Sequence, residues 1–340
     1  MAKTFIKELC LILDLYNMES KDAVKAGLRA YIEENESILD EKGLAFVREI
    51  LTQHAPALNI DFAVKKALEY TEKATYQAME ALVHNLNTMN SRAGAQVLHA
   101  GAIGPDGAFL TQLLQDAGAD TSALLQVQEA SGNAMIQVTP EGQNAIIVYG
   151  GANHCLTEAY VQSVLRQAEP GDLVLLQNET SQTAQIIAQA ADLGLRVVFN
   201  PSPFPAHPEQ LPLERVDTFI LNEIEGALLA GMPEEQDGDA IFDALRSRYP
   251  HAQIILTLGS RGVTAWLGGQ RYDQPCFTVR AVDTTGAGDT FCGYYLAGCC
   301  QGQAPAQCLR AASAAAAIAI TRPGAAPAIP TRDEVESLLK

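Results

Sequence analysis

A run of small and polar residues near the carboxyl end could perform phosphoryl transfer: Val282-Asp283-Thr284-Thr285-Gly286-Ala287-Gly288-Asp289-Thr290. Gly286, Ala287 and Gly288 have almost no side chains, so an anion can approach their backbone amides closely. A helix beginning near Gly288 would add a favourable dipole potential. Such an anion hole stabilises the charge of a migrating phosphoryl group, and Asp289 beside it could deprotonate the attacking hydroxyl. Alternatively, Asp289 only caps the first turn of the helix.

The elements that must position this run alternate between strands and helices from about Ala95 onward. The predicted helices include Thr180–Leu193 and Ala240–Arg248. Continuous apolar strands between helices predict an α/β domain with a doubly wound, mainly parallel sheet covered on both faces. The predicted strands are Gln96–Ala102, Asp172–Gln177, Arg196–Asn200, Thr218–Leu221 and Gln253–Leu258, and a hairpin joins Ala134–Thr139 to Asn144–Tyr149 around Pro140-Glu141-Gly142.

Residues 1 to about 90 follow a helical pattern instead. Apolar residues recur at helical spacing in two places, Leu9 to Tyr16 and Met79 to Leu86. We therefore divide the chain into an all-helical segment, residues 1–93, and the α/β domain, residues 94–340.

The composition excludes several classes of function. The net charge is −17, with 40 acidic residues against 23 basic ones, which argues against a nucleic-acid partner. The seven cysteines form no C-x-x-C pair and favour reduced thiols in a cytoplasmic protein. The amino terminus resembles no signal peptide, because Glu8 and Asp14 interrupt its apolar run. The alanine-rich stretch Ala311–Ile320 is too short to span a bilayer, so we expect no membrane partner.

Together with its flanking motifs, the sequence D-T-T-G-A-G-D-T-F-x-G resembles the second signature of the ribokinase (PfkB-type) sugar kinases, over about residues 94–340. Further motifs agree with that family in order and spacing. They are the glycine-rich turn Gly101–Gly107, the segment Gly150–Asn153, the loop Asn200–Pro203, the N-x-x-E motif Asn222–Glu225, the loop Thr257–Gly262 and the final loop Arg322–Pro327.

The resemblance implies a role for each matching residue. Asp289 would be the catalytic base and would contact the substrate, beside the anion hole Gly286–Gly288. Glu179 matches a sugar-side position, and Glu225 would hold Mg²⁺ through water. The positions matching the ATP site are Asn200, Asn222, Thr257, Leu258, Gly259, Ser260, Arg261, Gly262, Gly288 and Ser313. The positions matching a K⁺ shell are Asp283, Thr285, Ala319, Arg322, Gly324 and Ala328.

Each of these positions has a structural alternative. Asn222 could be an ordinary helix N-cap, and the glycines of Thr257–Gly262 could form an ordinary hairpin turn. Arg322 and Pro323 could simply terminate a helix. Glu179, following a strand, could be a solvated surface carboxylate.

The amino-terminal part departs from the family. The opening strand with G-x-x-N-x-D and the following G-G-K-G-A-N run, both of which grip the sugar in that family, are missing. The stretch Ala74–Val97 instead resembles part of anaerobic (class III) ribonucleotide reductases, although the remainder of that enzyme is not encoded. The string Arg92–Val97 suits both families, which suggests a junction of two unrelated genes there. An accessory helical domain is the alternative.

The predicted function is ATP-dependent phosphorylation of a sugar hydroxyl, with ribose as the favoured acceptor and Mg²⁺ and K⁺ as cofactors. The expected partners are ATP and a small sugar, and a homodimer is a further expectation. The alternatives are a kinase for another sugar or a nucleoside, and a non-catalytic protein that binds nucleotide.

Overall fold

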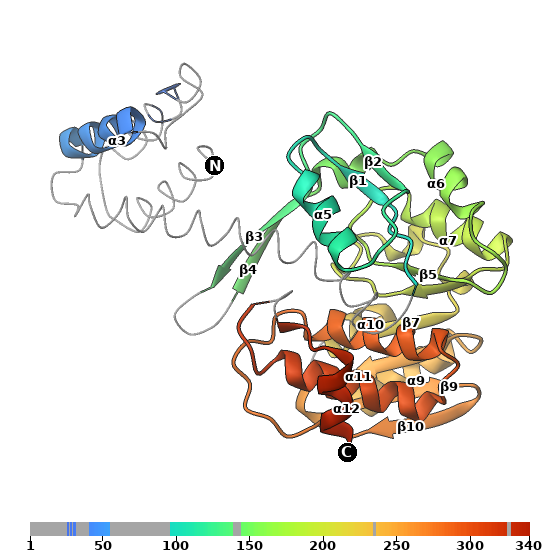
Figure 1. The fold of residues 1–340 in the computed structure, drawn as a ribbon. Coiled ribbons are helices and arrows are strands. Elements are labelled where there is room, and N and C mark those ends of the chain that lie inside the picture. The colour runs from blue at the N-terminus through green and yellow to red at the C-terminus, as the bar shows by residue number, and fades with distance from the viewer. Residues whose placement is uncertain are drawn as a thin grey trace. The chain divides into compact units, whose positions relative to one another are not determined.

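The computed structural model describes two compact units. One comprises residues 1–79 with 134–147, and the other residues 80–133 with 148–340 (Figure 1). The described residues are 26, 28, 30, 31, 41–54, 96–138, 144–233, 236–324 and 328–340. The two apolar repeats at 9–16 and 79–86, and residues 74–95 of the stretch 74–97 that was compared with a reductase, lie outside them.

In the smaller unit, α3 (Glu41–His54) buries an apolar stripe. Val47 and Leu51 lie one turn apart on it and are fully buried, as is Leu28. The ring of Tyr31 stacks on Phe46 at a centroid distance of 4.1 Å. These contacts are typical of an amphipathic helix packed on its neighbours.

The two strands of the predicted hairpin are confirmed, whereas its predicted turn, residues 140–142, lies outside the described residues. Strands β3 (Asn133–Val138) and β4 (Asn144–Tyr149) form a two-stranded sheet of their own.

The larger unit is built on a six-stranded sheet with the order β10-β9-β8-β7-β6-β5. Its four parallel strands are β5 (Leu173–Leu176), β6 (Arg196–Phe199), β7 (Thr218–Asn222) and β8 (Gln253–Thr257). Each lies within one residue of its predicted bounds. The antiparallel strands β9 (Val263–Leu267) and β10 (Gln270–Gln274) extend one edge and were not predicted.

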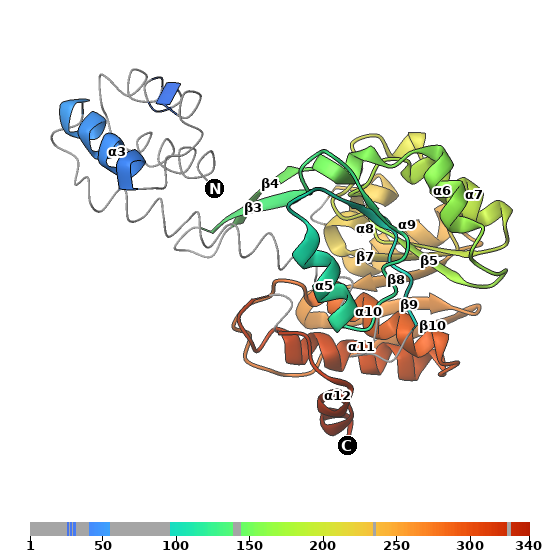
Figure 2. The same cartoon turned by 45° about the horizontal axis from the view of Figure 1, so that its top comes forward.

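Helices cover both faces of this sheet, as predicted (Figures 1 and 2). Successive side chains of β7 enter opposite cores, because side chains alternate along a strand. Phe219 and Leu221 belong to one core and Ile220 to the other. The first core is completed by α6 (Glu158–Leu165), α7 (Thr183–Asp192), α8 (Glu223–Ala230) and α9 (Gly238–Arg248), and the second by α10 (Ala287–Cys300), α11 (Pro305–Ala319) and α12 (Arg332–Leu339).

The predicted strand Gln96–Ala102 is largely wrong. The structure has β1 (Gly101–Ile103), paired in parallel with β2 (Leu124–Gln126), and α5 (Ala108–Asp116) follows β1. Before β1, only an isolated bridge joins Leu98 to Asp120. Leu98 is exposed and Val97 only half-buried, so the apolar residues here do not have the full burial of the strands in the main sheet.

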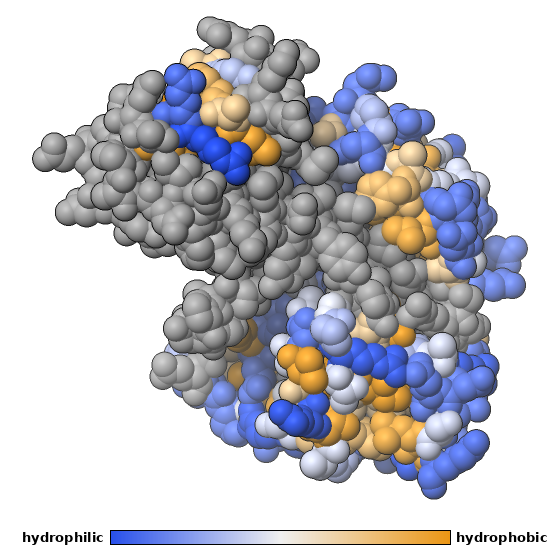
Figure 3. Space-filling model, turned by 60° about the vertical axis from the view of Figure 1, so that its left-hand side comes forward, coloured by the Kyte–Doolittle hydropathy of each residue, from blue (hydrophilic) through white to orange (hydrophobic). Residues whose placement is uncertain are grey.

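On the face drawn in Figure 3, hydrophilic side chains cover much of the described surface, and the hydrophobic patches between them are small. Among the described helices, none has the length and apolar character needed to cross a membrane.

A substitution at Phe219 tests how far the central strand β7 stabilises the larger unit. It is fully buried and its ring lies 4.8 Å from that of Tyr249. We expect Phe219→Ala to lower the free energy of unfolding by about 3–5 kcal/mol, because it leaves a cavity. Urea denaturation measures the change. Leu193→Ala, at an exposed position, is the control and should change it by no more than about 0.5 kcal/mol; equal effects of both would contradict this packing.

Candidate active site

Four polar residues lie at the carboxyl ends of the parallel strands. Gln177 follows β5 and Asn200 follows β6, whereas Asn222 and Thr257 are the last residues of β7 and β8. Asn222 and Thr257 are paired in the sheet register. In open α/β sheets, ligands bind outside this edge, so these strand ends are the first place to look for a site.

The residues predicted to form the anion hole lie at the amino terminus of α10. The helix begins at Ala287, one residue before the predicted start, because Gly286 is its N-cap with φ of 74°. Glycine adopts this left-handed conformation without steric cost. A Cβ added to Gly288 would meet no atom within 4 Å, so the space beside the first turn is open to a ligand. Asp289 lies in this same first turn.

A hydrogen-bonded bridge joins Asp289 to the strand ends. Nε2 of Gln177 donates to Oδ1 of Asp289 at 3.1 Å and to Oδ1 of Asn200 at 2.8 Å. Nδ2 of Asn200 donates to the carbonyl oxygen of Ile220 at 2.9 Å. The first turn of α10 therefore lies against the ends of β5 and β6. No role for Gln177 was predicted from the sequence, where its only signal is a polar residue directly after a buried strand.

Asn222 and Glu225 form a capping box at the start of α8. The amide of Glu225 donates to Oδ1 of Asn222 at 2.8 Å, and the amide of Asn222 donates to Oε2 of Glu225 at 3.0 Å. The N-cap alternative for Asn222 is therefore what the geometry shows. Glu225 is buried, and burial raises the pKa of its carboxyl; bonds from Asn222 and Ser202 oppose this, while the charge of Asp289 adds to it.

The carboxyl of Glu179 is also electrostatically coupled to Asp289. The side chain of Glu179 keeps solvent contact, yet the surrounding protein desolvates it enough to raise the pKa of its carboxyl, and the charge of Asp289 raises it further. Glu179, Glu225 and Asp289 thus form an acidic group at the strand ends. Within the described ranges, no three His, Cys, Asp or Glu side chains are arranged to hold a metal ion by themselves.

The predicted nucleotide loop is the connection between the antiparallel strands β8 and β9. Its residues 259–261 form a short 3₁₀ turn, and the amide of Leu258 donates to the carbonyl of Gly262 at 2.8 Å. Gly262 has φ of 93°, and a Cβ there would lie 2.2 Å from the carbonyl oxygen of Gln274. The hairpin alternative therefore describes the connection correctly. Its start at Thr257 nevertheless places it beside Asn222, at the edge that carries the acidic group.

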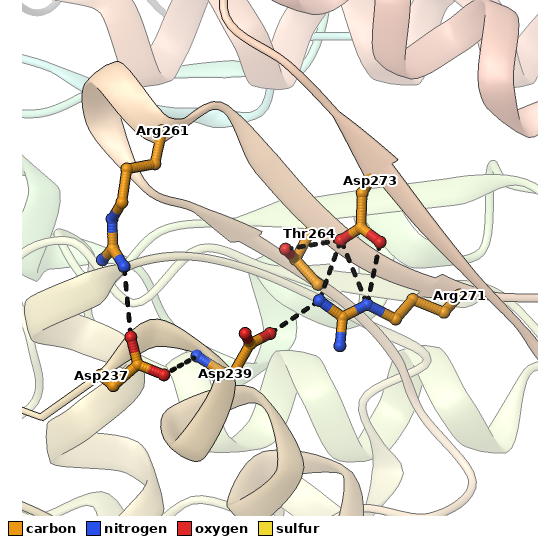
Figure 4. A network of polar contacts seen from close by, with 6 residues as sticks. All are labelled: Asp237, Asp239, Arg261, Thr264, Arg271 and Asp273. Carbon is orange, nitrogen blue, oxygen red and sulfur yellow. Dashed lines mark hydrogen bonds and ion pairs between the residues drawn. The ribbon is translucent and has the colours of Figure 1, made fainter.

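Arg261, in this loop, is engaged by carboxylates. Its guanidinium forms ion pairs with Glu223 and with Asp237, the latter at 3.4 Å. Figure 4 shows how the network continues from Asp237 through the backbone of Asp239 to Arg271. These contacts hold the loop against the starts of α8 and α9. An interaction of Arg261 with ATP would therefore have to use its backbone or displace these carboxylates.

The predicted K⁺ positions are partly brought together. Asp283 accepts hydrogen bonds from the amide of Thr285 at 2.9 Å, from its hydroxyl at 2.6 Å and from the amide of Gly324 at 3.0 Å. The amide of Arg322 turns back to the carbonyl of Ala319. The guanidinium of Arg322 pairs with Glu334 at the start of α12, so this residue also anchors the end of α11.

Two of the predicted site residues, Ala328 and Ser313, are less directly connected to the rest of the site. Ala328 is buried, but residues 325–327 before it lie outside the described part of the chain. Ser313 is buried on α11, and its hydroxyl has no hydrogen-bond partner in the described part of the chain. Among the described residues, no hydrogen bond joins Ser313 to the loop Thr257–Gly262.

Comparison with known proteins gives the class. The model of the pfkB family of carbohydrate kinases matches residues 84–332, and the chain belongs to this family. It is 33% identical to a ribokinase of Bacillus subtilis over 254 residues, 73% of this chain and 83% of that enzyme. It is also 33% identical to a ribokinase of Haemophilus influenzae over 199 residues, 58% of this chain and 65% of that enzyme.

Solved structures agree with this assignment. A ribokinase of Thermotoga maritima has a TM-score of 0.64 at 28% identity and covers 77% of this chain and 86% of its own. A ribokinase of Arabidopsis thaliana, complexed with ribose and ATP, has a TM-score of 0.66 at 29% identity, with 76% and 86% covered. The predicted ribokinase-like fold is confirmed, and the chain is a sugar kinase that transfers phosphate to a hydroxyl group.

The acidic group yields a prediction about charge. Asp289→Asn removes the negative charge that raises the pKa values of Glu179 and Glu225. We therefore expect both pKa values to fall in this variant, because a like charge disfavours ionisation. Titration of the glutamate carboxyl carbons by ¹³C NMR measures them. Asp333→Asn, at a residue that contributes to neither value, is the control; unchanged values in Asp289→Asn would contradict the coupling.

Proposed function

We propose that this sugar kinase transfers the γ-phosphate of ATP to the primary hydroxyl of D-ribose and releases D-ribose 5-phosphate. One observation carries the proposal. The Gln177 bridge holds Asp289 and the first turn of α10 against the strand ends, so a base and a set of helix amides lie together where ligands bind in such sheets. The ribokinases among its relatives favour ribose as the acceptor.

Each group then has a chemical task. Asp289 accepts the proton of the attacking hydroxyl, and the amides of Gly286–Gly288 stabilise the charge on the transferring phosphoryl group. Glu179, after β5, is on the sugar side. The residues proposed to line the ATP site are Asn200, Asn222, Thr257, Leu258, Gly259, Ser260, Arg261, Gly262, Gly288 and Ser313.

Magnesium fits this acidic group in the hydrated form that it prefers. Mg²⁺ keeps several waters and is bound by one or two carboxylates together with substrate phosphates. Glu225 is already bonded to Asn222 and Ser202, so contact through water suits it better than direct ligation. The ion would supply charge neutralisation of the phosphates, and it would also relieve repulsion among Glu179, Glu225 and Asp289.

Potassium fits the oxygen-rich loops around Asp283. The carboxylate of Asp283 joins the loop before α10 to the loop after α11 through Thr285 and Gly324. We propose that this pair of loops, with Ala319, Arg322 and Ala328, surrounds a K⁺ ion, largely through backbone carbonyls. The cation would stabilise the loop that leads into the anion hole.

The K⁺ proposal predicts an ion-dependent rate. Replacing K⁺ by tetramethylammonium should slow ADP release at saturating ATP and ribose, because the larger ion cannot enter the loops. Asp283→Ala should abolish the response to K⁺. Steady-state rates over a K⁺ titration measure both effects, and a rate that ignores K⁺ in the unaltered protein would refute the site.

The segment before the kinase domain is proposed to be foreign to it. Residues 1–93 would be a separate helical segment and residues 94–340 the kinase domain, joined near Arg92–Val97. Sequencing source DNA across this junction tests the hypothesis. A separate kinase gene with its own start and opening strands would support it, and an uninterrupted gene in independent isolates would favour an accessory helical domain. A cytoplasmic location and a homodimer are further proposals.

The catalytic proposal predicts a large effect at one carboxylate. In an ADP-release assay with ribose, Mg²⁺ and K⁺, Asp289→Asn should lower the rate by about 10²- to 10⁴-fold, because it removes the general base. ATP affinity, measured by calorimetry, should change little, since the amides of α10 remain. Asp333→Asn is the matched control.

Other outcomes separate the alternatives. Full activity of the Asp289→Asn variant would refute the proposal that Asp289 is the catalytic base. ATP binding without ADP release for any sugar or nucleoside in a panel would favour the non-catalytic alternative. Faster turnover with another sugar or a nucleoside would show that this compound, and not ribose, is the preferred acceptor. The proposed mechanism would remain.

A further inference from the structure

The amide of Gln177 has an orientation that two of its hydrogen-bond partners determine. Nε2 lies 3.1 Å from Oδ1 of Asp289 and 2.8 Å from Oδ1 of Asn200. A carboxylate only accepts hydrogen bonds, so the NH₂ group rather than the carbonyl of Gln177 must face Asp289.

The other end of the bridge is fixed by the backbone. The carbonyl oxygen of Ile220 can only accept, so it requires the NH₂ group of Asn200, which donates to it at 2.9 Å. Oδ1 of Asn200 is thereby turned toward Gln177. The chain of bonds has an obligate acceptor at each end, and no flip of either amide satisfies both.

We propose that Gln177 is the positioning residue of the catalytic base: its NH₂ group, oriented through Asn200 by the strand β7, holds the carboxylate of Asp289 at the ends of the strands. Without that donor, Asp289 could rotate toward the amides of its own helix, where aspartate is a common first-turn residue. The inference rests on the proposed function of Asp289 as the base.

The ionisable groups around Asp289 increase the importance of the hydrogen bond that Gln177 donates to it. The ionisable groups coupled to Asp289 are Glu179 after β5, Glu225 on α8 and the buried thiol of Cys292 on α10 itself. When ionised, Glu179 and Glu225 oppose ionisation of the base, whereas burial raises the pKa of the Cys292 thiol and keeps it uncharged. A hydrogen bond donated to a carboxylate favours its charged form. Gln177 therefore both orients the base and keeps it ionised.

Gln177→Met tests the inference, because it keeps the length of the side chain and removes the donor. We expect kcat to fall about ten- to a hundred-fold, since small displacements of a reacting group cost this much. The KM for ATP should change little. The acid limb of the pH–rate profile should move to higher pH, because the charged form of Asp289 loses its donor.

Gln162→Met is the matched control. Nε2 of Gln162 also donates to a carboxylate, that of Glu158 at 3.2 Å, but on the exposed side of α6. This variant should leave kcat and the pH profile unchanged. Thermal melting of both variants shows whether either loses the fold.

A double variant separates positioning from general stability. In the Asp289→Asn background, Gln177→Met should cause no further loss of kcat, because residues that act as a unit are not additive. A further tenfold loss there would overturn the inference, as would a Gln177→Met enzyme with the parent kcat and pH profile.

A titration by ¹³C NMR keeps the inference testable even if the chain phosphorylates no sugar. The Asp289 carboxyl signal, assigned by its disappearance in Asp289→Asn, should titrate at higher pH in Gln177→Met than in the parent protein. The same titration in both would overturn the role of Gln177 and leave the proposed function standing. A shifted titration in an inactive chain would refute the function alone.

Discussion

The proposed mechanism depends on one constraint: the carboxylate of Asp289 must stay ionised and correctly oriented next to the carboxylates of Glu179 and Glu225. Repulsion alone would favour its protonation or its rotation away. The amide of Gln177 opposes both outcomes, and its direction is determined by a backbone carbonyl two strands away. The loop Thr257–Gly262, the capping box and the start of α10 all meet at the sheet edge where this amide lies.

The fold holds this edge in place by burying α10 along one face of the sheet. Phe291 and Leu296 of α10 pack with Ile220 and Ile255 of the central strands. The position of Asp289, at the start of that helix, is consequently set by a hydrophobic core rather than by a mobile loop. The capping box Asn222–Glu225 serves α8 in the same way on the other face. A residue can therefore be structural and functional at once, and the alternatives for Asn222 do not exclude each other.

Much of this arrangement could be predicted from the sequence because buried parallel strands are continuous apolar runs, as in β5 to β8. The hairpin β9–β10 was missed although Gly268-Gly269 is a typical turn between such strands. The strand at 96–102 was overestimated, since its apolar residues Val97 and Leu98 are only half-buried or exposed. Gln177 could not be identified, because a single polar residue after a strand gains its meaning only from partners 23 and 112 positions away.

The most direct test of the account is a crystal structure of the protein with ribose, Mg²⁺ and a non-hydrolysable ATP analogue. The account predicts that the carboxylate of Asp289 accepts a hydrogen bond from the primary hydroxyl of the sugar. It also predicts that the terminal phosphate lies on the amides of Gly286–Gly288, with Gln177 still bonded to Asp289. A complex in which the analogue binds elsewhere, or in which Asp289 faces away from the sugar, would contradict it.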